Sequence, residues 1–128
     1  MHEGLVRGYI ATASHRGLTE ETLAAYVAPW LGPEGQPALY RQMAQGDERF
    51  TDEVDHRYGE VTVPTLVCWG TEDTWLPPAK GEQLAAALPH AELHWLQGAG
   101  HLAQEDAPAQ LAARLNEFLS RRARPAGG

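Results

Sequence analysis

The chain has 128 residues, a length that allows one domain at most, and its 17 acidic and 10 basic side chains give a formal net charge of −7. This acidic balance argues against nucleic acid and membrane surfaces as partners, because binding to either requires a surplus of lysine and arginine. The one cysteine, Cys68, excludes an intramolecular disulfide and a thiolate metal cluster. There is no signal-peptide pattern and no apolar run long enough to span a membrane, so we expect a cytoplasmic protein.

The first 60 residues carry helical patterns only. Apolar side chains at helical spacing predict a first helix over residues 5–10. A second helix is expected directly after Thr19, whose hydroxyl can accept the free amide hydrogens at a helix start. Prolines and glycines then predict a loop over residues 29–37. Two further helices are expected, one over residues 39–45 and one over residues 47–58.

After Pro64 the pattern alternates between strands and helices. The short apolar run 65–69 is typical of a strand buried on both faces of a parallel sheet. A helix from Pro78, a second strand over 92–96 and a last helix over 106–122 follow. Two strands joined by a helix form a crossover unit of open parallel sheets, which predicts an α/β fold. Residues 123–128 are predicted to be a disordered tail.

Each predicted strand is followed by a loop with one chemically useful side chain. Functional groups of open α/β sheets collect in the loops at the carboxyl ends of the strands, and these loops contain Asp73 and His101. An aspartate that accepts the Nδ1 hydrogen of an imidazole fixes the tautomer of a histidine general base. Each residue alone is a weak signal, since a loop aspartate most often forms a local turn and a loop histidine is most often solvated.

Two motifs make this pair more specific. The sequence W-G-T-E-D-T-W-L-P covers residues 69–77, and G-A-G-H covers residues 98–101, with one predicted helix and one predicted strand between them. With their surroundings they closely resemble the C-terminal third of the α/β-hydrolase family. The resemblance implies that Asp73 is the acid and His101 the base of a catalytic triad. Residues 1–60 resemble, less specifically, the helical cap that this family inserts before these strands.

The nucleophile that this family requires has no counterpart in the chain. A nucleophile elbow of the G-x-S-x-G type is expected before the cap, and no such motif is present. Ser14 lacks small flanking residues and a preceding strand, Ser120 ends the last helix, and Cys68 lies within a predicted strand. The oxyanion-hole loop is missing as well. We therefore interpret residues 1–60 as a cap and 61–122 as the C-terminal βαβα part of an α/β hydrolase whose N-terminal half is absent.

Other residues have competing interpretations. Trp75 and Leu76 lie beside Asp73 and are the predicted substrate-binding residues, although packing between cap and core explains Trp75 equally well. His90 and His94 have a helical metal-ligand spacing but enter a strand, so we predict no metal site and no cofactor.

Glu105 and Asp106 follow His101 closely along the chain. Their place at the predicted start of the last helix explains both carboxylates through capping and the helix dipole. We therefore assign neither residue to the site.

The resulting hypothesis is a hydrolase of a small, apolar to moderately polar substrate that carries an ester, a carbon–carbon bond, an epoxide or a halide. Asp73 orients His101 as the general base, and the chain alone is expected to be inactive because the nucleophile is missing. Two alternatives stay open: a non-catalytic binding or interaction module, and one half of a split hydrolase that assembles with a separate N-terminal chain. Two parallel strands expose apolar surface, which also predicts self-association.

Overall fold

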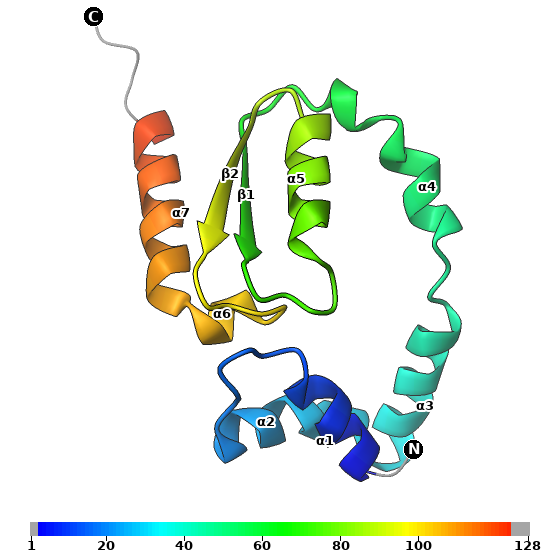
Figure 1. Ribbon diagram of the computed structural model, residues 1–128. Coiled ribbons are helices and arrows are strands. Elements are labelled where there is room, and N and C mark those ends of the chain that lie inside the picture. Colours follow the sequence, from blue (N-terminus) through cyan, green and yellow to red (C-terminus); the bar gives the residue numbers. More distant parts are fainter. Residues whose placement is uncertain (1–2, 124–128) are drawn as a thin grey trace, which may run out of the picture.

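The computed structural model describes residues 3–123 of the chain (Figure 1). Helices come first and form what we call the helical segment, residues 3–60: α1 (Glu3–Ala11), α2 (Glu20–Val27), the short η1 (Ala28–Trp30), α3 (Gly32–Ala44), α4 (Arg49–Asp55) and η2 (Tyr58–Glu60). The remaining elements are β1 (Thr65–Gly70), α5 (Pro78–Ala87), β2 (Ala91–Leu96), α6 (Ala103–Asp106) and α7 (Pro108–Ala123). Of the predicted tail, Ala123 ends α7, and residues 124–128 lie outside the described residues.

The two strands form a parallel sheet, as the sequence predicts. They pair in register, from Thr65 opposite Ala91 to Gly70 opposite Leu96. Helix α5 covers one face of the sheet and α7 covers the other, and the carboxyl ends of both strands point toward α1 and α2 (Figure 1). This end of the sheet therefore faces the helical segment.

The predicted start of α2 is confirmed in detail. Thr19 is the residue before the helix, and its hydroxyl oxygen accepts a hydrogen bond from the Thr22 backbone N–H at 3.1 Å. Acidic side chains fill the first turn, where the positive end of the helix dipole favours them. Helix α1 likewise covers the predicted residues 5–10.

The predicted loop over residues 29–37 is wrong. The chain forms η1 there and begins α3 at Gly32. Pro33 occupies the first turn of α3, where a missing N–H leaves no acceptor unpaired, and Pro37 is accommodated inside the helix. Gly35 permits close packing, because an added Cβ would lie only 2.3 Å from the Pro29 carbonyl oxygen.

The last predicted helix is in fact two helices. The single turn α6 ends at Asp106, and Ala107 adopts a non-helical backbone before Pro108 starts α7. Asp106 is therefore the last residue of α6, and the prediction that its carboxylate caps the long helix is wrong. Its carboxylate accepts hydrogen bonds from other parts of the chain.

The core of the βαβα part is small. Leu96, Ala99 and Ala107 form a buried cluster, against which Cys68 and Leu111 pack. Most other strand residues keep some exposure, whereas strands of a fully covered parallel sheet are buried on both faces.

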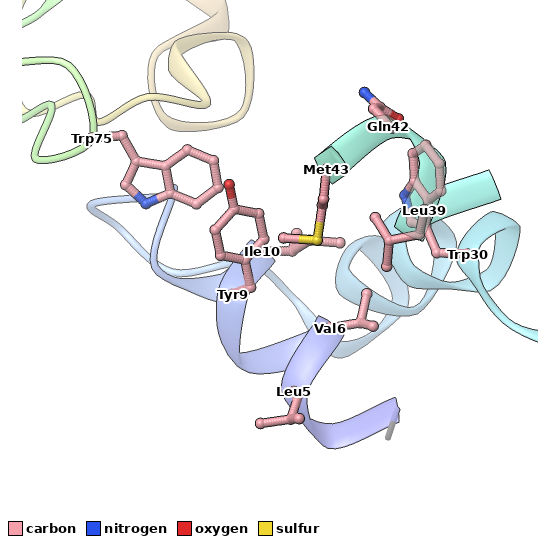
Figure 2. A pocket seen from close by; sticks show the side chains of 9 residues that line it. All are labelled: Leu5, Val6, Tyr9, Ile10, Trp30, Leu39, Gln42, Met43 and Trp75. Atoms are coloured by element: carbon pink, nitrogen blue, oxygen red, sulfur yellow. The ribbon is translucent and has the colours of Figure 1, made fainter. Parts of the chain in front are cut away.

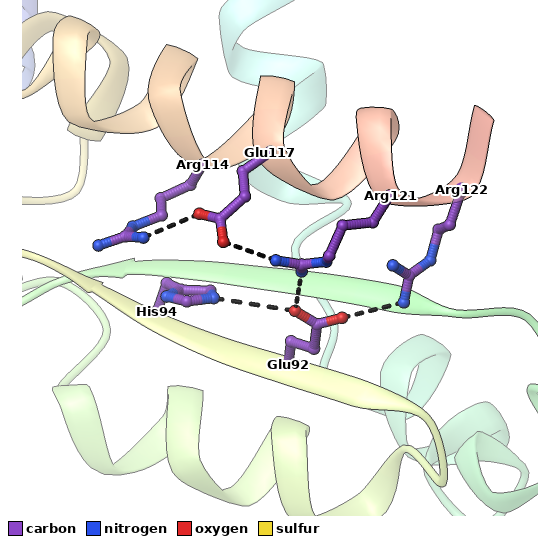
Figure 3. A network of polar contacts seen from close by, with 6 residues as sticks. All are labelled: Glu92, His94, Arg114, Glu117, Arg121 and Arg122. Carbon is purple, nitrogen blue, oxygen red and sulfur yellow. Dashed lines mark hydrogen bonds and ion pairs between the residues drawn. The ribbon is translucent and has the colours of Figure 1, made fainter. Parts of the chain in front are cut away.

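Helix α7 is fastened to β2 by an ion-pair network on the molecular surface. Glu92 of β2 accepts hydrogen bonds from the guanidinium groups of Arg121 and Arg122, and Glu117 bridges Arg121 and Arg114 (Figure 3). Among residues 3–123 no helix is both long and apolar enough to cross a membrane. The cytoplasmic location stays a prediction.

Candidate active site

The loops that follow β1 and β2 are hydrogen-bonded to each other. The Thr71 N–H donates to the Leu96 carbonyl oxygen at 3.1 Å, and the Glu72 N–H donates to the Ala99 carbonyl oxygen at 2.9 Å. Gly70 allows this approach, because an added Cβ would lie 2.3 Å from that Ala99 oxygen. The sheet register and these loop contacts therefore bring the residues that follow into one place.

Asp73 is buried in the first loop and uses both oxygens of its carboxylate. The residue is 7% exposed. Its Oδ1 accepts hydrogen bonds from the backbone N–H groups of Trp75 and Leu76, both at 2.9 Å. Its Oδ2 lies 3.0 Å from Nδ1 of His101. One oxygen thus holds the local turn, and the other faces the imidazole.

His101 lies at the end of the second loop with its ring partly open to solvent. The turn before it has Gly98 at φ +66°, in the left-handed region that favours glycine. With a proton on Nδ1 donated to Asp73, Nε2 of the neutral ring carries the lone pair. The arrangement can therefore accept a proton at Nε2 while the carboxylate stabilises the resulting imidazolium.

Trp75 and Leu76, the two predicted substrate-binding residues, have different surroundings in the structure. The Trp75 ring stacks on His101 at a centroid distance of 5.0 Å and contacts the Tyr9 ring at 4.5 Å. Its Nε1 donates to the Thr12 hydroxyl at 3.1 Å, so the side chain joins the helical segment to the imidazole. Leu76 is 45% exposed and lines, with Asp73 and His101, an open cavity of about 270 Å³.

A larger cavity of about 600 Å³ lies within the helical segment, and Trp75 forms part of its wall. Side chains of α1 face those of α3 across it (Figure 2). Gln42 contributes an amide, and no lining side chain is charged; the lining residues are Leu5, Val6, Tyr9, Ile10, Trp30, Leu39, Gln42, Met43 and Trp75.

The contacts and burial of Ser14, Cys68 and Ser120 do not indicate a nucleophile. The Ser14 hydroxyl donates to Oδ1 of Asp106 at 2.5 Å. Burial raises the pKa of the Cys68 thiol, so this side chain within β1 stays protonated at neutral pH. Ser120 is exposed on α7. Within residues 3–123, no three histidine, cysteine, aspartate or glutamate side chains are grouped in a way that could hold a metal ion.

Sequence reasoning missed one buried carboxylate, that of Asp106. It is 3% exposed and accepts hydrogen bonds from the Ser14 hydroxyl and from three backbone N–H groups. Burial acts to raise the pKa of this carboxyl, but these hydrogen bonds outweigh it and hold the pKa below its ordinary value. The sequence signal was an aspartate five residues after the histidine, which capping explained equally well.

These features define an α/β protein with a hydrogen-bonded aspartate and histidine at the ends of neighbouring parallel strands. Residues 3–114 match the model of the "Alpha/beta hydrolase family", and the chain belongs to this family. A crystal structure of an α/β hydrolase fold protein from Burkholderia ambifaria superposes with a TM-score of 0.85 at 39% sequence identity. The match covers 91% of this chain and 43% of that one.

Several curated relatives are named as hydrolases. A 2-hydroxy-6-oxononadienedioate/2-hydroxy-6-oxononatrienedioate hydrolase from Cupriavidus pinatubonensis is 41% identical over 79 residues, which is 62% of this chain and 27% of that protein. A 2-hydroxy-6-oxo-6-phenylhexa-2,4-dienoate hydrolase from Burkholderia cepacia is 42% identical over 52 residues, which is 41% of this chain and 18% of that protein. The matched segments thus cover less than a third of the length of these relatives.

Proposed function

We propose that this chain supplies the acid and the histidine of a hydrolase triad, with Asp73 orienting His101 as the general base. The observation that carries the proposal is the 3.0 Å contact between Asp73 Oδ2 and His101 Nδ1, in a member of the α/β-hydrolase family. The buried carboxylate fixes the ring orientation and leaves Nε2 to receive a proton. His101 then returns this proton to the leaving group as the substrate bond breaks.

The nucleophile in this proposal comes from polypeptide outside these 128 residues. It attacks the electrophilic carbon of the substrate while His101 accepts its proton. The open cavity lined by Asp73, Leu76 and His101 is the place where a nucleophile-bearing turn fits against the imidazole. A segment in the same polypeptide and a separately encoded partner are both compatible with this geometry.

We further propose that the helical segment acts as the cap of the enzyme and binds the apolar part of the substrate. The cavity between α1 and α3 is lined by apolar and aromatic side chains, which favour an uncharged group of matching size. Trp75 separates this cavity from the imidazole and contacts both sides. In this proposal, Leu76 borders the reacting part of the substrate.

Carbon–carbon bond hydrolysis is the reaction that the relatives' names favour. The names of these relatives describe substrates with either a second carboxylate, in the dioates, or a phenyl group. A second carboxylate would need a cation in the cavity, and none of the lining side chains is charged. We therefore propose a substrate whose group in this cavity is uncharged. Ester hydrolysis is the second candidate reaction. It is favoured by the similarity to the structure of a thermophilic esterase, at 25% identity and a TM-score of 0.74.

The test uses one polypeptide in which the N-terminal part of the Burkholderia ambifaria protein precedes this chain at the matched boundary. We expect this fusion to cleave 2-hydroxy-6-oxo-6-phenylhexa-2,4-dienoate with a higher kcat/KM than 2-hydroxy-6-oxononadienedioate. The 128-residue chain alone should cleave neither substrate and no model ester. His101-dependent turnover by the chain alone, or a folded fusion without any hydrolase activity, would contradict the proposal, and the latter would favour a binding module.

A further inference from the structure

The carboxylate of Asp106 gathers four donors from two distant parts of the chain. Its Oδ1 accepts from the Ser14 hydroxyl at 2.5 Å and the Arg16 N–H at 3.1 Å, and its Oδ2 accepts from the His15 N–H at 2.8 Å and the Gly100 N–H at 2.7 Å. The group is almost completely buried. Such charge-assisted hydrogen bonds are about twice as strong as neutral ones.

The turn 13–16 and the loop 98–102 are also in direct backbone contact. The Leu102 N–H, directly after the histidine, donates to the Ala13 carbonyl oxygen at 2.9 Å. An added Cβ at Gly100, directly before the histidine, would lie 2.9 Å from that same oxygen. The backbone on both sides of the imidazole is thus held by one turn, and the Asp106 carboxylate joins the two segments.

We infer that Asp106 is a positioning residue for His101. It ties the turn 13–16 to the loop 98–102 and thereby holds the imidazole against Asp73. The hydrogen bond between His101 Nδ1 and Asp73 is 3.0 Å long, and a donor–acceptor distance beyond about 3.5 Å no longer makes one. A displacement of the loop 98–102 by more than about 0.5 Å therefore breaks the hydrogen bond between His101 and Asp73.

This role couples the helical segment to the imidazole. The turn 13–16 follows α1, whose side chains form one wall of the larger cavity. The positions of that wall and of the histidine consequently depend on the same buried carboxylate. The importance of this coupling for turnover rests on the proposed function, but the positioning itself does not.

The variant Asp106→Asn tests the inference in the 128-residue chain. The amide keeps the shape of the side chain, but its NH2 group cannot accept the two hydrogens that one carboxylate oxygen accepts. Long-range ¹H–¹⁵N spectra at a pH where histidine is neutral report the ring tautomer. We expect the wild-type chain to show His101 with its proton on Nδ1, and Asp106→Asn to show a mixture of both tautomers.

The matched control is Glu105→Gln. Glu105 is the neighbouring carboxylate on α6, but it is exposed and accepts a hydrogen bond from the Tyr26 hydroxyl. We expect this variant to keep the wild-type His101 ring signals. An Asp106→Asn variant with unchanged backbone shifts in β1 and β2, and with His101 still protonated on Nδ1, would overturn the inference. Neither outcome depends on hydrolysis, so the inference and the proposed function can fail separately.

If Asp106→Asn does not fold, the milder variant Ser14→Ala tests whether Asp106 positions His101. It removes one of the four donors and leaves the carboxylate in place. We expect hydrogen exchange at the Gly100 amide to rise about tenfold, which corresponds to losing roughly one hydrogen bond, with a smaller shift of the His101 ring toward the mixed tautomer. Unchanged exchange at Gly100 together with unchanged ring signals would overturn the inference.

Discussion

At the scale of single residues, Asp73 performs two tasks with two oxygens. Oδ1 fixes the turn through the N–H groups of Trp75 and Leu76, and Oδ2 faces His101. The turn holds the carboxylate rigidly, so the oxygen that meets the imidazole is oriented by its own backbone. A loop aspartate that forms a local turn can therefore also contact the imidazole of a histidine.

Gly70 is the residue whose backbone must come closest to the loop of the histidine. Its missing Cβ would meet the Ala99 and Gly100 carbonyl oxygens at 2.3 and 2.5 Å, so we expect Gly70→Ala to lower the free energy of unfolding by about 2 to 3 kcal/mol. Gly59→Ala is the control, because a Cβ there meets nothing within 4 Å. Urea denaturation should show this control unchanged or more stable by about 0.4 to 1 kcal/mol. Equal effects of the two substitutions would contradict the close approach at Gly70.

Asp106 predicts a specific loss of stability in acid. Burial opposes ionisation of this carboxyl, but its four hydrogen bonds place its native pKa below the ordinary value of about 3.9 for the unfolded chain. Its stabilisation is therefore fully present above the unfolded pKa and is lost as the pH falls through the lower native pKa. Urea midpoints measured from neutral to acidic pH should fall less steeply for Asp106→Asn than for the wild type. Parallel curves would contradict a charged Asp106.

The sequence predicted the meeting of Asp73 and His101 but not the role of Asp106. The pair is marked by two strand ends and two motifs, which determine position along the chain and in space. The donors to Asp106 include Ser14 and Gly100, which lie 92 and 6 residues away from it, and no local pattern connects them. In the sequence, capping of the following helix explained the carboxylate of Asp106 equally well, but in the structure Asp106 is the last residue of α6.

At the scale of elements, residues 29–37 resemble a loop in the sequence because three prolines and two glycines lie close together there. Pro33 stands in the first turn of α3, where proline is favoured, and Gly35 is needed for close packing on η1. Helices with such internal prolines depend on tertiary packing, which the sequence pattern does not reveal. The strands and α5 were predictable, because a buried parallel strand and a proline-started helix have clear local patterns.

The attachment of α7 to the sheet gives a prediction at this scale. Burial acts to raise the pKa of Glu92, but hydrogen bonds from Arg122 and Arg121 and the charges of both groups hold the pKa below its ordinary value. We expect Glu92→Gln to lower the urea midpoint slightly at low salt and not at about 1 M salt, where charges are screened within about 3 Å. Glu53→Gln on α4 is the control and should show no salt-dependent difference. An effect of Glu92→Gln that is independent of salt would contradict the ion-pair explanation.

At the scale of the whole molecule, the sheet that residues 3–123 form has two strands, and most strand residues stay partly exposed. Large apolar side chains are exposed on several elements, among them Leu5 at 65% and Leu119 at 60%. The Cupriavidus pinatubonensis hydrolase and the Burkholderia ambifaria protein are each more than twice as long as this chain. The sequence indicated that part of the fold is missing, because it contains no nucleophile elbow. Which apolar side chains are exposed could be seen only in the structure.

We expect the isolated 128-residue chain to self-associate. Exposed apolar patches and a short parallel sheet with unpaired strand edges favour contact with further copies. Sedimentation velocity over a range of protein concentrations should show a mass that rises with concentration. Fusion to the N-terminal part of the Burkholderia ambifaria protein should suppress this rise. A chain that stays monomeric over the whole concentration range would contradict the interpretation as part of a larger fold.

The most direct test of the central claim is a double-mutant cycle on Asp73 and His101 in that fusion. The measured quantity is kcat/KM for the wild type, Asp73→Asn, His101→Ala and the double variant. If the two residues act as one acid–base unit, each single substitution lowers kcat/KM by about 10³-fold or more, and the double variant is hardly worse than His101→Ala. Folded single variants that keep activity within about tenfold of the wild type, or losses that simply multiply, would contradict the claim.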